Sequence, residues 1–195
     1  VTRFHFPTFH EMFPVEKRKL KLLREWLRYR ARRLIFARQC EALVAFIHEN
    51  PLWQPVFAQY PYRVNTLLSQ YCDKRFNATQ RLDAIETNFA MAEKHFGIAL
   101  CETLISQQPV LLAQLTDELA LNLTLNHIDP YEGFFAIALT DINQRTIYSA
   151  SFTFLTDNRL LIASIQGPKG DEAQDLVRQA TKLLHGVRPM FMLVN

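Results

Sequence analysis

The spacing of apolar side chains predicts that the first half of the chain is mainly helical. Over residues 14–50 the apolar positions recur every three or four residues, as they do on one face of a helix. Pro14 suits the first turn, because a residue there needs no amide donor, and the Asn50-Pro51 step ends the pattern. The proline-rich aromatic stretch of residues 51–62 predicts short helical turns that pack on the body.

Two further helices are expected before residue 97. One covers about residues 63–72, and the next begins after Asn77 or Thr79, either of which can cap it. The apolar positions of this second helix keep helical spacing up to Gly97, a residue type well suited to follow a helix end. These positions are Leu82, Ile85, Phe89, Ala92 and Phe96.

Beyond Gly97 the apolar period changes from that of a helix to that of a strand. Residues 98–107 are still expected to be helical, and residues 110–115 then shift towards alternation. Strict alternation follows over residues 119–126, which is typical of a half-buried strand. Its apolar side carries Leu119, Leu121, Leu123 and Leu125, and its other side carries Ala120, Asn122, Thr124 and Asn126.

Three more strands and one helix complete the predicted fold. The strands are expected at residues 133–140, 146–155 and 159–166, and the helix at residues 171–185. The inner face of this helix would carry Leu176, Val177, Ala180, Leu183 and Leu184. The sequence thus predicts an α+β fold in which a mainly helical region (residues 1–97) packs as one unit with an antiparallel meander and closing helix (residues 98–195).

Composition excludes several classes of protein. Cys40, Cys72 and Cys101 are odd in number and roughly thirty residues apart, which fits neither a disulfide framework nor paired metal ligands. We therefore expect buried free thiols in a reducing compartment and no metal site. Residues 1–13 lack the apolar core of a signal peptide, and no apolar run approaches about 20 residues, so no transmembrane segment is expected. These observations predict a cytoplasmic protein.

The charge is concentrated near the N-terminus. Residues 16–38 carry ten basic and two acidic side chains, a local net charge of +8, whereas the whole chain carries +3. Helical geometry aligns a ridge of cations beside one apolar stripe. The ridge consists of Lys17, Lys21, Arg24, Arg28 and Arg32, and the stripe of Leu20, Leu23, Leu27, Ala31 and Leu34.

The basic helix (residues 14–38) allows three interpretations. The ridge is a solvated face, or it binds anionic phospholipid or lipopolysaccharide headgroups with Trp26 and Tyr29 as interfacial anchors, or it binds nucleic acid. Nucleic acid is the least favoured of the three, because no recognised reading motif accompanies the charge.

The loop of residues 166–170 lies between the last predicted strand and the closing helix. Such a junction gathers free backbone amides at a helix N-terminus and suits an anion such as a phosphate. The candidate cofactor-binding residues are Gln166, Gly167, Lys169 and Gly170. A purely structural interpretation stays open, because Asp171 as N-cap with Gln174 three residues later would form a capping box.

Few residues are candidates for acid-base chemistry. Glu132, at the start of a predicted strand, and His127 qualify only if they face the glycine loop. His185 is a further candidate, but it also has a plain interpretation at a helix C-terminus in which Gly186 takes the left-handed conformation. The chain carries no nucleophile elbow and no Walker loop.

Several of these segments together carry a family resemblance. They are Glu132-Gly133, the loop of residues 166–170, and residues 181–189 (TKLLHGVRP), with Asn50-Pro51-Leu52 and Arg81-Leu82 similar in layout. The chain resembles the VirK/LapB-like family, which is a virulence-associated bacterial domain of unknown function. Members of that family continue beyond the Arg-Pro step, so the resemblance implies that a chain ending at Asn195 is truncated.

The resemblance implies a Gram-negative protein that is cytoplasmic or peripheral to the inner membrane. It implies links to envelope or surface-virulence functions, such as surface-protein display or antimicrobial-peptide tolerance, and no established reaction or cofactor. The leading hypothesis is therefore an envelope-associated protein that binds anionic membrane or envelope components through its basic helix. A nucleic-acid-binding accessory role is the third hypothesis.

The second hypothesis is an enzyme. The strand, loop and helix at residues 159–185, preceded by a meander, are similar to the cofactor-binding part of acyl-CoA-dependent N-acyltransferases of the GNAT type. That similarity implies a GNAT-like core with acyl-CoA at Gln166 to Gly170. The residues of this loop depart from the expected Gln/Arg-x-x-Gly-x-Gly/Ala pattern, because Lys169 occupies a position at which that pattern has a glycine.

Overall fold

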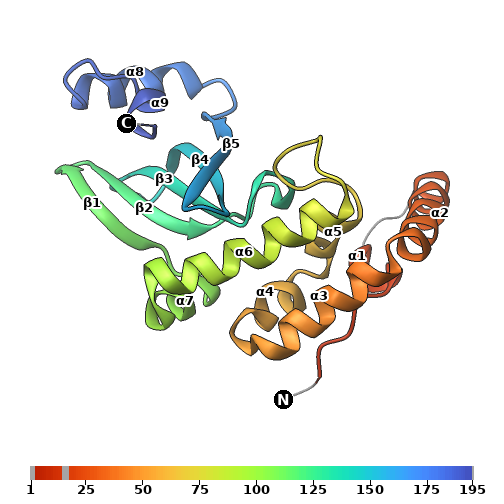
Figure 1. Ribbon diagram of the computed structural model, residues 1–195. Coiled ribbons are helices and arrows are strands. Elements are labelled where there is room, and N and C mark those ends of the chain that lie inside the picture. Colours follow the sequence, from red (N-terminus) through yellow and green to blue (C-terminus); the bar gives the residue numbers. More distant parts are fainter. Residues whose placement is uncertain (1–2, 15–17, 195) are drawn as a thin grey trace.

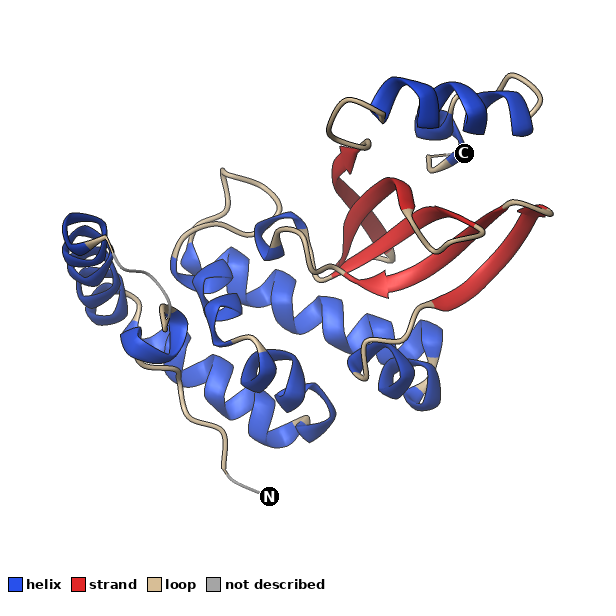
Figure 2. Ribbon diagram, turned by 180° about the vertical axis from the view of Figure 1, so that it is seen from behind, coloured by secondary structure: helices blue, strands red, loops and turns tan. Residues whose placement is uncertain are grey.

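The structure is a computed structural model that describes residues 3–14 and 18–194. A group of helices lies beside a five-stranded sheet (Figures 1 and 2). Two C-terminal helices lie at the end of the sheet that is farther from this group. The helices before residue 97 are α1 (Phe9–Met12), α2 (Lys19–Ile35), α3 (Ala37–Glu49), α4 (Gln54–Gln59), α5 (Asn65–Leu68) and α6 (Ala78–Phe96). Short 3-10 turns at Pro51–Trp53 and Pro61–Val64 connect them, as the proline-rich stretch predicts.

The sheet is the predicted antiparallel meander. After α7 (Ile98–Ile105) the strands follow one another in space in the order β1-β2-β3-β4-β5, and every neighbouring pair is antiparallel. The strands are β1 (Val110–Thr116), β2 (Leu119–Leu125), β3 (Phe135–Asp141), β4 (Thr146–Leu155) and β5 (Arg159–Gln166). Helices α8 (Ala173–Leu183) and α9 (Pro189–Met192) follow. The α+β fold class is thus confirmed.

Helix α6 forms as the sequence indicates. Asn77 caps it, and the Asn77 side chain and Gln80 satisfy each other's backbone amides in a capping box. Gly97 follows the last helical residue with φ +78°, a conformation that costs glycine little. The apolar face of α6 packs on β4 and on the helices before it, so that one buried core contains residues from both sides of Gly97.

The apolar face of the sheet carries two clusters. Leu123, Leu125, Phe135 and Phe152 belong to the large core shared with α6 and α7. Leu119, Leu139, Ile147 and Ala150 form a smaller cluster with α8 and α9, through Ala180, Leu184 and Leu193. The opposite face of the same strands carries small and polar side chains, because the alternation puts Asn122, Thr124 and Asn126 there.

Three local predictions are wrong. Helix α8 starts at Ala173 rather than 171, and its N-cap is Glu172 in helical conformation without a side-chain cap, so the capping box of Asp171 and Gln174 does not form. The helix expected at residues 63–72 is a 3-10 turn, in which Arg63 is buried, followed by the short α5. The basic helix expected at residues 14–38 is α2, which begins at Lys19 and ends at Ile35, and a separate helix, α3, begins at Ala37.

The three cysteines are free thiols, as predicted. Cys40 and Cys101 are buried, and Cys72 is half-buried. Burial raises the pKa of all three thiols, to about 12 for Cys72 and about 11 for Cys101. Each thiol therefore stays protonated and unreactive near neutral pH.

Gly133 allows β4 to approach the start of β3, which gives a test of the fold. A Cβ at Gly133 would lie 2.4 Å from the Phe152 carbonyl oxygen, and φ is +114°. We predict that Gly133→Ala lowers the free energy of unfolding by roughly 2–4 kcal/mol, measured by urea denaturation. Gly170→Ala is the matched control: φ is +97° and the space is open, so only the backbone term of about 1 kcal/mol should appear. Equal losses in the two variants would contradict this packing.

Candidate functional site

Helix α2 is attached to the body along one side only. The Tyr29 hydroxyl donates a hydrogen bond to the Pro7 carbonyl (2.8 Å), and the Tyr29 ring contacts Phe9 with ring centres 6.0 Å apart. The Arg33 guanidinium lies over the Phe6 ring at 4.5 Å. Partial burial raises the pKa of Tyr29. Tyr29 thus faces the body, and its predicted role as an interfacial anchor is wrong.

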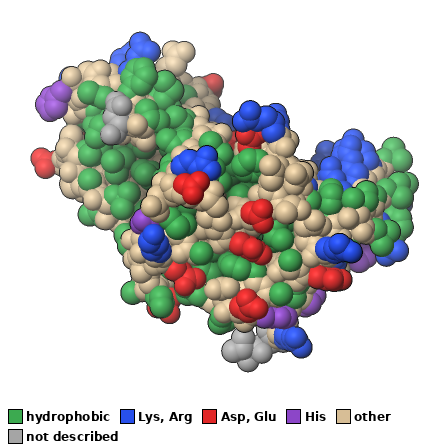
Figure 3. Space-filling view, viewed as in Figure 1, with side chains coloured by type: hydrophobic (Ala, Val, Ile, Leu, Met, Phe, Trp, Pro, Cys, Tyr) green, Lys and Arg blue, Asp and Glu red, His purple; other side chains and the backbone are tan. Residues whose placement is uncertain are grey.

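The predicted apolar stripe of α2 faces away from the body. At 100° per residue, Leu27 lies about 160° round the helix from Tyr29, and no described residue of α2 is buried. Figure 1 shows α2 at one end of the molecule, and Figure 3 shows hydrophobic side chains along its outer edge. The exposed fractions of the largest apolar side chains are Leu20 86%, Leu23 55%, Leu27 54%, Leu34 75% and Ile35 72%.

Cations border this stripe on both sides. Arg24 and Arg28 lie on one side, each paired with Glu25 at 3.3 and 3.0 Å, and both remain largely exposed. Lys19 and Arg30 lie on the other side by helical geometry, and the Arg30 guanidinium is 5.6 Å from the centre of the Trp26 ring, which is 40% exposed. In Figure 3 the Lys and Arg side chains gather beside the hydrophobic edge of α2.

The remaining members of the predicted ridge differ in position. Lys21 and Arg32 are half-buried, and Arg32 lies on the side of α2 that faces the body. Lys17 lies outside the described residues. The cationic part of the surface therefore consists of Lys19, Arg24, Arg28 and Arg30 around the outer stripe, rather than one continuous ridge. We call the exposed aliphatic stripe and these four cations together the outer surface of α2.

The glycine loop (residues 166–170) makes close contacts with other parts of the chain. A Cβ on Gly167 would lie 2.8 Å from the Tyr148 ring, so glycine is needed there to let the loop close over that ring. Beside the loop lies a cavity of ≈ 280 Å³ bounded by Tyr148, Gly167, Pro168 and α8. Lys169 and Gly170 are exposed.

Only one of the weak catalytic candidates meets this loop. The Gln166 side-chain amide donates a hydrogen bond to the Glu132 carboxylate (2.7 Å), which brings Glu132 to the first residue of the loop. Gly186 has a positive φ (92°), as predicted, and the exposed His185 before it is also left-handed (φ 53°). Among the described residues no hydrogen bond joins His185 to a carboxylate.

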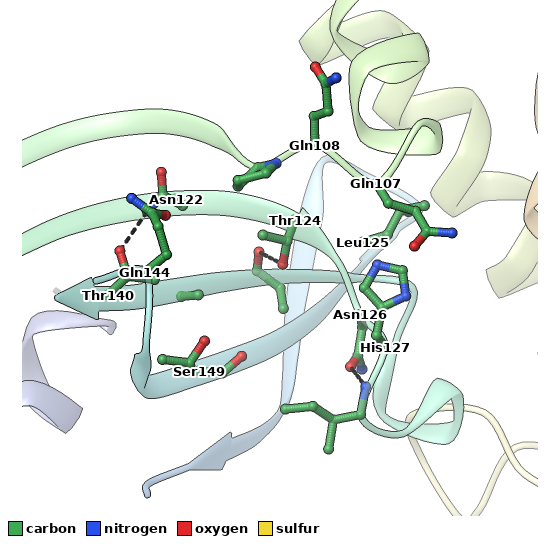
Figure 4. Close-up of a pocket in the computed structure, with 15 residues that line it drawn as sticks. Gln107, Gln108, Asn122, Thr124, Leu125, Asn126, His127, Thr140, Gln144 and Ser149 are labelled. Carbon is green, nitrogen blue, oxygen red and sulfur yellow. Dashed lines mark hydrogen bonds between the residues drawn. The ribbon is translucent and has the colours of Figure 1, made fainter. Parts of the chain in front are cut away.

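The polar face of the sheet contains a cavity that sequence reasoning did not identify. It has a volume of ≈ 480 Å³ and lies over β2, β3 and β4, beside the segment that joins α7 to β1 (Figure 4). Its side chains include Gln108, Asn122, Thr124, Thr140, Gln144 and Ser149. The polar positions of the alternating pattern at residues 119–126 were the available sign of this cavity in the sequence. The same pattern equally predicts a sheet face in contact with solvent.

A second cavity adjoins the first at His127. It has a volume of ≈ 360 Å³ and is bounded by Tyr60, Tyr62, Tyr131 and the Arg63 side chain. Arg63 is buried and donates to the carbonyls of Val56 and Asn126 (2.9 and 3.2 Å). Burial lowers the pKa of Arg63 to about 10, and partial burial followed by the Arg63 charge lowers the pKa of His127. His127 is therefore neutral at physiological pH, and its ring meets Tyr60 and Arg63.

The described residues lack two further features. They contain no group of three or more His, Cys, Asp or Glu side chains placed to share a metal ion. In the same ranges, no helix combines the length and the apolar content that crossing a membrane requires.

Comparison with known proteins gives matches along nearly the whole chain. The family model described as protein of unknown function (DUF535) matches residues 18–195. An "Uncharacterized protein" of Haemophilus influenzae is 52% identical over 194 residues, which cover 98% of this chain and 67% of that protein. "Membrane protein LapB" of Mannheimia haemolytica is 29% identical over 193 residues, or 98% of this chain and 84% of that one.

A second Haemophilus influenzae "Uncharacterized protein" is 25% identical over 195 residues. These residues are the whole of this chain and 65% of that protein, so the chain spans about two thirds of the length of both Haemophilus relatives. No solved structure matches the chain significantly.

Proposed function

The chain belongs to the DUF535 family, as its resemblance to VirK/LapB-like proteins predicted, and on this premise we propose that it is an envelope-associated protein that docks peripherally on an anionic membrane. The observation that carries the proposal is the outer surface of α2, an apolar stripe with cations on both sides that nothing in the described structure covers. The name of the Mannheimia relative, a membrane protein, supports the same location.

The composition of this surface suits a membrane interface better than water. An amphipathic helix lies in the plane of the interface when its apolar face enters the acyl boundary and its cations meet the headgroups. Burying a Leu or Ile side chain completely is worth about 1.5–3 kcal/mol, and each Lys or Arg near an anionic surface adds about 1 kcal/mol. Five exposed aliphatic side chains and four cations therefore supply ample driving force.

The attachment of α2 makes docking possible without unfolding. Its inner side is held by Tyr29, Arg33 and Phe36, so the stripe is presented outward on a rigid support. The helix has 17 residues and so is about 25 Å long at 1.5 Å per residue, enough for one in-plane contact. A basic face that only contacts solvent would not need an aliphatic stripe at its centre, because exposing aliphatic side chains to water gives no favourable free energy.

Flotation with vesicles tests both components of the proposal. Wild-type protein should float with vesicles of phosphatidylglycerol and phosphatidylethanolamine, and much less with zwitterionic vesicles. Arg24→Gln with Arg28→Gln removes two of the four cations, so it should lower the bound fraction severalfold at low salt and weaken its salt dependence. Leu23→Ser with Leu27→Ser should lower binding at every salt concentration, because the apolar contribution is not screened.

Matched controls lie elsewhere on the surface. Leu160→Ser removes an exposed leucine of β5 (49% exposed), and Arg178→Gln removes an exposed cation of α8 that pairs with Asp175. Both variants should float like wild type. Recovery independent of lipid charge and of salt would sink the electrostatic part of the proposal, and an equal effect of Leu160→Ser would sink the assignment to α2. Salt-sensitive binding to DNA but not to vesicles would favour nucleic acid instead.

A second candidate function is acyl transfer from acyl-CoA. The specific observation in its favour is the hydrogen bond from Gln166 to Glu132, which sets a carboxylate at the base of the glycine loop. The exposed Asp171 and Glu172 weigh against it, since they place two negative charges where a pyrophosphate would lie. A GNAT-like core and an acyl-CoA site at Gln166, Gly167, Lys169 and Gly170 remain predictions.

Thermal denaturation with CoA and acyl-CoAs tests this candidate. A ligand at 100 times its dissociation constant should stabilise the protein by about 2.7 kcal/mol, which is an increase of several degrees in Tm. Gly167→Ala is not an informative variant, because its Cβ meets Tyr148, so Lys169→Ala is the variant that should reduce the shift. An unchanged Tm with every donor would contradict acyl-CoA binding.

A further inference from the structure

Three polar side chains of the cavity on the sheet are buried although none of the described helices lines this cavity. Asn122, Thr140 and Ser149 are only 5%, 5% and 6% exposed, and they point into the same space from β2, β3 and β4 (Figure 4). The floor between them is made of Ala136 and Ala138, whose small side chains leave the space empty. A volume of ≈ 480 Å³ lies within the range of ordinary small-molecule sites, about 300–1,000 Å³.

The cavity has hydrogen-bonding capacity left over. Asn122 Nδ2 donates to Thr140 Oγ1 (2.8 Å), and no described residue donates to Asn122 Oδ1. Ser149 Oγ has no hydrogen-bond partner among the described residues although its side chain is more than nine-tenths buried. Among the described residues, the buried side-chain polar atom that lacks a hydrogen-bond partner is Asn88 Nδ2, so Ser149 Oγ and Asn122 Oδ1 are instead open to the cavity, where a ligand can reach them.

The charge of the cavity narrows the chemistry of that partner. No Asp, Glu, Lys or Arg is among the described residues that line it, and its one titratable side chain is His127, whose lowered pKa keeps it neutral. A charged ligand would lose its hydration there without an opposite charge in return. Amide and hydroxyl groups, which both donate and accept, instead match a ligand that carries many hydroxyls.

We infer that this cavity binds the uncharged part of a saccharide. The amide and hydroxyl groups of Asn122, Thr140 and Ser149 would bond the sugar hydroxyls, and the methyl groups of Ala136 and Ala138 would contact a C–H face. Gln108 and Gln144 stand at the rim, where long amides can bond further hydroxyls. The inference does not depend on membrane docking, because it concerns a different surface.

The test measures binding of named neutral sugars to the intact chain. Glucose, galactose, mannose, N-acetylglucosamine, maltose and lactose are titrated, with gluconate and N-acetylneuraminate as charged counterparts, by ligand-observed NMR in the millimolar range. At least one neutral sugar should bind saturably and should shift the imidazole resonances of His127. The charged counterparts should bind at least tenfold more weakly.

Two variants assign the binding to the cavity. Ser149→Ala with Thr140→Val removes both hydroxyls at nearly unchanged volume and should weaken binding at least fivefold. Ala138→Leu fills the floor and should abolish it. Thr181→Val, a hydroxyl on α8 outside the cavity, is the control and should bind like wild type.

Variant folding is checked by urea denaturation before binding is compared. The double variant serves if Ala138→Leu unfolds. Absence of saturable binding by every neutral sugar, stronger binding of the charged sugars, or unchanged affinity in the folded double variant would each overturn the inference.

Discussion

The ring of Phe89 is the point at which the helical part of the chain is joined to the sheet. It is fully buried on α6, stacks on Trp53 with ring centres 4.4 Å apart and on Phe134 at 5.1 Å, and meets Phe57 edge-on at 5.9 Å. Trp53 comes from the Pro51–Trp53 turn and Phe57 from α4, whereas Phe134 directly precedes β3. Replacing such a ring by a small side chain typically costs about 3–5 kcal/mol, so the relation of helices to strands depends on this contact.

This core buries apolar side chains of the helices from α3 to α7, but two other surfaces of the protein stay uncovered. Helix α2 contributes only its inner side to the body, so its aliphatic stripe stays in water at a cost that a membrane would remove. The strands of the sheet use only their apolar face for the two clusters, so their opposite face keeps its small and polar side chains. Both candidate sites therefore have the same origin. Folding uses one face of α2 and one face of the sheet, and the opposite face of each stays uncovered.

Periodicity predicted the order and type of the long elements well. The ranges of β4 and β5 match the predicted strands, and the cap and end of α6 follow from Asn77 and Gly97. Elements whose structure depends on distant partners were predicted less well. The helix expected at residues 63–72 is absent, and Arg63 lies instead in the Pro61–Val64 turn, where it reaches the carbonyls of Val56 and Asn126; local sequence contains no sign of that contact.

The sites were less predictable than the fold. The spacing predicted an apolar stripe on α2, but which side of the helix faces the body depends on Pro7 and Phe9, which belong to another segment. The polar cavity needs three strands in register before its groups converge, and alternation within a single strand cannot reveal that. The bond between Glu132 and Gln166 likewise joins residues that only the sheet brings together.

The central claim is that the outer surface of α2 enters the membrane, and the two tryptophans of the chain allow this to be measured directly. Trp26 lies on α2 beside the stripe, whereas Trp53 is fully buried in the core and serves as an internal reference. With anionic vesicles that contain brominated phospholipid, a quencher confined to the acyl region, the account predicts partial quenching of the fluorescence. Trp26→Phe should remove the quenchable fraction. Bound protein whose fluorescence is unquenched, or equal quenching in Trp26→Phe, would contradict insertion of α2.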